Sequence, residues 1–157
     1  MEYLTVKWIH ILSSTLLFGT GLGTAFHMWM THLSGEPRAI ARAARNTVWA
    51  DWLFTTPSVI IQPLSGAYLV HLAGFGWTED WLIATYVLYA VAGLCWLPVV
   101  GLQIRARKLA EQAVADQTEP PDDYHRIMRW WFALGWPAFI AVICIFWLMV
   151  TKPVLDF

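Results

Sequence analysis

The stretch VKWIHILSSTLLFGTGLGTAFHMWM, residues 6–30, decides the fold of this chain. The hydrocarbon layer of a bilayer is about 30 Å thick, and a helix needs about 20 apolar residues to cross it. The stretch is therefore long enough to span a membrane. It contains two histidines, His10 and His27. Because ionisable side chains are costly inside a span, each is a functional candidate.

Three later stretches have the same apolar character. With a first span over 4–31, they predict spans over 48–73, 80–104 and 129–151. Backbone groups in lipid must be bonded within their own segment, so the spans should be helices. We predict an all-α, four-helix transmembrane bundle that forms a single integral membrane domain over 1–157. Prolines inside the later spans should kink them: Pro57, Pro63, Pro98 and Pro137.

The overall composition supports this class. The sequence is 58% hydrophobic and 13% charged, whereas soluble domains are about a quarter charged. A net charge of −1 gives no field that would attract nucleic acid. The two cysteines, Cys95 and Cys144, lie in apolar runs and predict neither a disulfide nor a zinc site. The first span is longer than a signal-peptide core and ends in a basic loop, so we expect it to be retained.

The distribution of basic residues predicts the orientation. Eight of the ten lie between the first and second spans or around the connection between the third and fourth. Since cytoplasmic loops carry the excess of Lys and Arg, both termini should be outside the cytoplasm (N-out/C-out). We expect a bacterial inner membrane with both termini periplasmic. Residues 36–47 and 104–118 should form short helices or helix extensions at the cytoplasmic surface.

The depth of the histidines suggests a haem site. His10 and His71 should lie in the same leaflet on two different spans, and a haem between helices takes one imidazole from each side. His27 follows His10 by 17 residues, roughly 26 Å along a helix, so it could serve only a second haem. Two alternatives stay open: His71 as an interfacial side chain, and His10 bonded to a neighbouring hydroxyl or carbonyl.

Polar neighbours of His10 fit such a site. Lys7 lies on the same helix face and could pair with a haem propionate. Ser13 and Ser14 could bond the other ring nitrogen of His10 or a carbonyl, and such bonds fix a ligand's tautomer.

Other polar and small residues in the spans need partners. We expect Asp51 to pair with Arg45 or Arg105, and Gln62 to bond a carbonyl freed by the neighbouring proline. Gly19 and Gly23 have the spacing of a helix contact. Most tryptophans should form an interfacial belt, whereas three deeper ones could line a cavity: Trp96, Trp136 and Trp147.

Long segments resemble a known family. ADWLFTTPSVIIQPLSG, CWLPVVGLQIRARKLA and WFALGWPAFIAVICIFWLMVTKP are similar to the DUF2269-type family of predicted small integral membrane proteins. This resemblance covers nearly the whole chain and implies no particular activity.

A more distant resemblance covers the first two spans. KWIHILSSTLLFGTGL and LFTTPSVIIQPLSG resemble HemJ-type protoporphyrinogen oxidases, which implies haem b with His10 as axial ligand. The third span lacks the lysine of those proteins and has Ala84 and Thr85 instead. The resemblance therefore implies the haem scaffold and not that enzyme's specific reaction.

Two functions follow as hypotheses. The first is a haem b membrane protein with a redox role, either electron transfer or oxidation of a small lipophilic substrate such as a quinol or porphyrinogen. The second is a cofactor-free transporter, or a membrane subunit that binds a partner. A homodimer is compatible with either, and the surrounding lipid is a partner in both.

Overall fold

The computed structural model describes residues 1–154, and these form helices joined by short connections. The elements are α1 (Glu2–Ser34), α2 (Pro37–Ala50), the π-helical turn η1 (Asp51–Thr55), α3 (Thr56–Ala73), α4 (Asp80–Ala115) and α5 (Asp122–Thr151). Since α2, η1 and α3 run on without a break, four helices are long and apolar enough to cross a membrane. The predicted all-α class and its four spans are confirmed.

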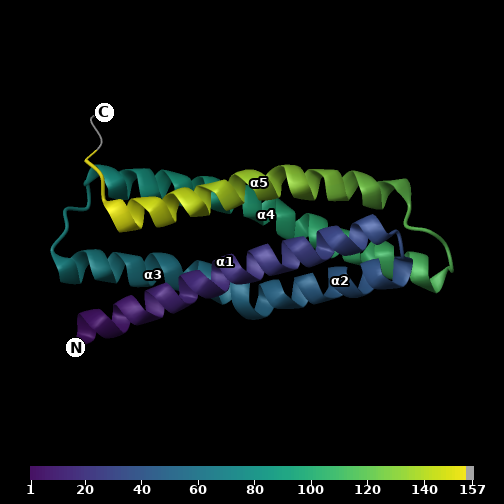
Figure 1. The fold of residues 1–157 in the computed structure, drawn as a ribbon, viewed down its shortest axis with the longest axis horizontal. Helices are drawn as coiled ribbons and strands as arrows, with labels where there is room; N and C mark the ends of the chain where they lie inside the picture. Colours follow the sequence, from purple (N-terminus) through teal and green to yellow (C-terminus); the bar gives the residue numbers. More distant parts are fainter. Residues whose placement is uncertain (155–157) are drawn as a thin grey trace.

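The helices form two pairs that are joined at one end. Helix α1 packs on α3, and α4 packs on α5, while α2 packs on both α1 and α4. The start of α1, the end of α5 and the α3–α4 connection lie at one end of the bundle, on the left of Figure 1. We call this the terminal end. The α1–α2 and α4–α5 connections lie at the opposite end, which we call the loop end.

The loop end holds the main hydrophobic core. Its fully buried members come from α1, α2, α4 and α5, and they include Met28, Ile40, Ala110, Tyr124 and Met128. Small side chains on the facing surfaces of α2 and α4 let these helices approach closely. The segments predicted as cytoplasmic helices thus become α2 and the last turns of α4, and they pack as parts of the bundle.

A proline explains the π-helical turn in the second span. Pro57 lies at the first positions of α3 and has no N–H for the preceding turn. The N–H of Thr56 bonds the carbonyl of Asp51, five residues earlier. This wider turn, a form often found at functional sites, places Asp51 and Thr55 on the inner face of the helix.

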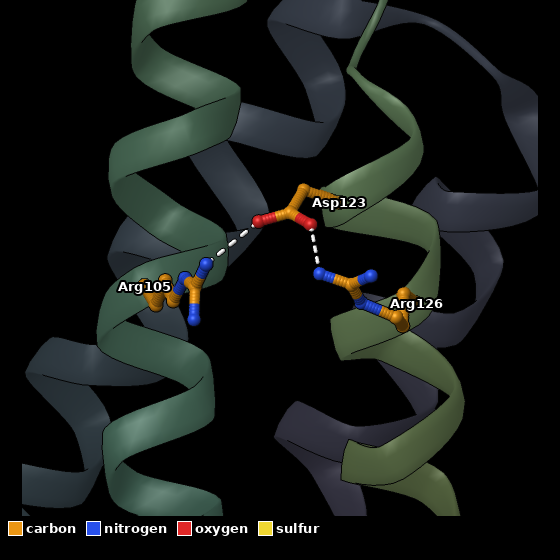
Figure 2. A network of polar contacts seen from close by, with 3 residues as sticks. All are labelled: Arg105, Asp123 and Arg126. Carbon is orange, nitrogen blue, oxygen red and sulfur yellow. Dashed lines mark hydrogen bonds and ion pairs between the residues drawn. The ribbon is translucent and has the colours of Figure 1, made fainter.

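An ion-pair network ties α4 to α5 at the loop end. Asp123 accepts a hydrogen bond from Arg105 at 2.6 Å and another from Arg126 (Figure 2). Arg105 is therefore not the partner of Asp51 that the sequence suggested. Both arginines are more than half exposed, so the network adds little to stability.

The packing of two kinds of residue in the spans differs from expectation. Among residues 1–154 a Cβ added at Gly19 or Gly23 would meet no atom within 4 Å, so the helix contact that their spacing predicts is not made within this part of the chain. Trp81 and Trp131 lie near span ends, where the interfacial belt is expected, but both are buried. The indole of each donates a hydrogen bond inside the protein, to Glu79 and Gln103 respectively.

Candidate functional site: a cavity between the helix pairs

A large cavity separates the two helix pairs. Its volume is about 1770 Å³, and α1, the second span, α4 and α5 all contribute to its mostly apolar walls. Ligand pockets for small molecules are typically about 300–1,000 Å³, so the space can hold a large lipophilic molecule. Of the three tryptophans predicted to line a cavity, Trp96 and Trp136 do so, whereas Trp147 is not part of the lining.

Two side chains cross the cavity between its ends. The ring of Phe18 on α1 stacks on Phe139 of α5 with centroids 4.7 Å apart. The hydroxyl of Tyr89 on α4 donates to the carbonyl of Val59 on α3 at 2.5 Å. These contacts hold the helix pairs at a fixed separation and mark the middle of the cavity.

His10 lines the cavity near the terminal end, and its hydrogen bonds favour one tautomer. Its Nδ1 lies 2.8 Å from the hydroxyl oxygen of Ser65 on α3. The Ser65 hydroxyl also lies 2.6 Å from the carbonyl of Ile61, so it can donate its one proton there and accept from Nδ1–H of His10. This arrangement corresponds to the Nδ1–H tautomer, in which Nε2 keeps its lone pair. Among residues 1–154 no hydrogen bond to Nε2 is present.

The backbone around His10 is also fixed by the second span. Gln62 donates from Nε2 to the carbonyl of His10 at 2.8 Å. The sequence suggested that Gln62 would bond a carbonyl freed by Pro63. Its side chain bonds the backbone of α1 instead. A Cβ at Gly66 would lie 3.3 Å from Cε1 of the imidazole, so the glycine makes room for the ring.

Two lysines lie at the His10 end of the cavity. Lys7 and Lys152 both line it, from the two opposite helix pairs. The Lys152 ammonium lies 4.4 Å from the ring centroid of Phe75. Within residues 1–154 neither lysine forms an ion pair with a carboxylate. Ser14 also lines the cavity, but its hydroxyl donates to the carbonyl of Ile11 at 2.7 Å.

The other predicted haem ligands lie elsewhere. His71, in the last turn of α3, is exposed and does not line the cavity. His27 is also exposed and outside the lining. The structure thus brings Lys7, His10 and Ser14 to one cavity and places neither of the other two histidines there.

A polar cluster forms the loop-side end of the cavity. Asp51, only 7% exposed, accepts hydrogen bonds from the side-chain amide of Gln103 and, at 2.8 Å, from the hydroxyl of Thr55. The indole N–H of Trp131 donates to the side-chain carbonyl oxygen of Gln103 at 3.3 Å. The expected ion pair of Asp51 with Arg45 or Arg105 is wrong, because neutral donors occupy both carboxylate oxygens.

Sequence reasoning missed several residues of this cavity. Ser65 and Gly66 were seen only as part of a motif, although they hold the ring of His10. A signal was available in the sequence: the small residues Ser65, Gly66 and Ala67 follow the polar pair Gln62–Pro63 within one apolar span. Lys152 gave no such signal, because it lies far from Lys7 in the sequence.

The comparison with known families agrees with this architecture. Residues 4–153 match the family described as predicted integral membrane protein (DUF2269). Since the match covers almost the whole chain, the protein belongs to that family. Neither the comparison with curated proteins nor the comparison with solved structures gave a match.

Proposed function

We propose that this protein is a haem b-binding membrane protein with a redox role. The observation that carries the proposal is the free Nε2 lone pair of His10, which belongs to a side chain lining a cavity of about 1770 Å³. Ligating histidines usually donate their other N–H to a fixed acceptor, as Nδ1 of His10 does to Ser65. His10 would be the axial ligand of the haem iron.

The rest of the cavity fits the same group. Its walls are apolar, as the macrocycle requires, and Lys7 and Lys152, which form no ion pair among residues 1–154, supply two ammonium groups for the propionates. Gly66 leaves the space that the imidazole needs beside α3. Lys7 and His10 come from α1 and Lys152 from the end of α5, so binding would also join the two helix pairs at the terminal end.

The role of the chain's residues follows from these contacts. Bound haem would supply one-electron chemistry, for electron transfer or for oxidation of a small lipophilic substrate such as a quinol or porphyrinogen. Ser65 would hold the His10 tautomer and raise its basicity, and the apolar walls would exclude water from the iron. Because His71 and His27 do not line the cavity, His10 is the histidine that would hold the haem there.

We propose the same topology that the charge distribution predicted. Eight of the ten basic residues belong to α2, the second half of α4 and the first turns of α5. These three segments lie toward the loop end of the bundle. The positive-inside rule then places the loop end in the cytoplasm, and the His10 end of the cavity toward the periplasm of a bacterial inner membrane.

The test is the pigment of the purified protein. After expression with haem supply, wild-type protein should show a Soret band, and His10→Ala should lose it. His71→Ala and His27→Ala are matched controls that should keep the band, since neither side chain lines the cavity. A colourless wild-type protein would contradict the proposal, and so would an unchanged spectrum in His10→Ala.

The alternative function is a cofactor-free transporter, and one observation favours it. The cavity is large, and exposed residues line it at both ends, such as Lys7 at the terminal end and Arg129 at the loop end. A carrier would present such an accessible cavity to its substrate. Colourless protein that binds an organic ligand in the cavity would support this function over the first.

A further inference from the structure

The loop-side end of the cavity has a carboxylate without a counter-charge. Both oxygens of Asp51 accept hydrogen bonds, from Thr55 and from Gln103. Within residues 1–154 no lysine, arginine or histidine pairs with it, and Arg129, which also lines the cavity, is exposed to solvent. A cation brought to this carboxylate would favour its ionised form and pair with it.

A second polar group at the same place has no partner. Among the described residues the hydroxyl of Thr47 has no hydrogen-bond partner, although Thr47 is only 2% exposed and lines the cavity. Thr47 is four residues before Asp51 on a continuous helix, so both side chains lie on one face. A buried unpaired hydroxyl is destabilising by about 1–3 kcal/mol. Its position beside the carboxylate suggests that a ligand completes its bonding.

We infer that this end of the cavity binds the cationic nitrogen of a lipophilic organic amine. The ammonium or amidinium group would pair with Asp51 and donate a hydrogen bond to the Thr47 hydroxyl. The apolar part of the molecule would lie along the cavity walls. Charge complementarity selects this class of ligand over neutral or anionic ones.

Aromatic side chains around the carboxylate suit a cation. Trp131 lines the cavity and is held by its hydrogen bond to Gln103, which also bonds Asp51. Trp96 lines the cavity two turns before Gln103 on the same face of α4. A cation over the face of a tryptophan ring is stabilised by about 0.5–2 kcal/mol.

This amine site is distinct from the His10 end. Ser65, which bonds His10, follows Asp51 by 14 residues, roughly 20 Å along the helix at about 1.5 Å per residue. The Tyr89–Val59 contact crosses the cavity between the two levels. The amine site therefore does not depend on haem binding, and His10→Ala should leave it intact.

The experiment uses a fluorescent probe with the whole chain in lipid nanodiscs. Aminoacridine is a planar cation with N–H donors, and acridine is its neutral analogue at mildly alkaline pH. Fluorescence anisotropy should show saturable binding of aminoacridine above the level of empty nanodiscs. Asp51→Asn should weaken binding by roughly tenfold or more, because the ligand loses a charge-assisted hydrogen bond.

A second variant keeps the test valid if Asp51→Asn does not fold. Thr47→Val conserves the shape and removes a hydroxyl that has no partner in residues 1–154, so the fold should persist. It should weaken aminoacridine binding several-fold. Asp116→Asn, which changes an exposed carboxylate beyond the end of α4, should bind like wild type. Equal binding by wild type, Asp51→Asn and Thr47→Val would overturn the inference, as would equally tight binding of neutral acridine.

Discussion

The two ends of the bundle are built differently although the same helices run through both. At the loop end α2 fills the space between the helix pairs, and Ala44, Ala106 and Ala110 are completely buried there. At the terminal end α3 packs mainly on α1, and the cavity lies between the two pairs. A Cβ on Gly93 or Gly135, both in the cavity lining, would meet no atom within 4 Å.

Small side chains therefore have different roles at the two ends of the bundle. At the loop end alanines let helices touch, so their size determines packing and stability. In the cavity, small residues leave room that no side chain of the chain fills. The first set should therefore be intolerant of enlargement and the second tolerant, unless a ligand occupies the space.

The largest expected loss of stability comes from truncating a large side chain in the loop-end core. Met128, 1% exposed, lies in the loop-end core, and Met128→Ala should lower the free energy of unfolding by about 3 kcal/mol. Met30→Ala is the control, because Met30 is half exposed and its loss should leave stability nearly unchanged. Denaturation in detergent, followed by circular dichroism, measures both. Equal losses would show that the loop end is not a packed core.

Enlarging a side chain should distinguish the two ends directly. Ala110→Leu inserts bulk where there is no space and should cost about 2 kcal/mol. Ala92→Leu, on the same helix but in the cavity lining, should cost much less. The same denaturation assay applies. A larger penalty at Ala92 than at Ala110 would mean that the cavity is not a space in the folded protein.

Removing the hydroxyl of Ser65 should have a smaller effect on stability. In Ser65→Ala the His10 Nδ1–H loses its acceptor, which should cost about 1 kcal/mol and weaken haem binding about tenfold. Ser65→Thr keeps the hydroxyl and should retain most of the affinity. Haem titration of the three proteins checks this. If Ser65→Ala bound haem as tightly as wild type, Ser65 would not orient the His10 ring.

The smallest effect should come from a methyl group beside His10. Gly66→Ala places a Cβ 3.3 Å from the imidazole, so the ring must shift by a few tenths of an ångström, at a cost below about 1 kcal/mol. The Soret maximum should move, whereas Gly135→Ala, with open space at its Cβ, should leave it in place. An identical spectrum in both variants would mean that the ring is not confined by Gly66.

Length and composition were enough to predict the spans, because a helix bonds every backbone group within its own segment and the apolar stretches have the length of a helical span, not of a barrel strand. Lys7, His10 and Ser14 were predicted to share a site because they share one face of a helix. The partner of His10 was not predictable, since it depends on the register between α1 and α3. Asp51 was misassigned because a carboxylate suggests an ion pair, whereas tertiary packing brought the amide of Gln103 to it.

The most direct test of the central claim is a titration of haem-free protein with haem b in nanodiscs. The Soret absorbance and the quenching of tryptophan fluorescence should both saturate at one haem per chain for wild type and for His71→Ala. His10→Ala should show no saturable phase in either signal. Saturable binding in His10→Ala with the affinity of wild type, or none in wild type, would contradict the claim that the cavity holds a haem on His10.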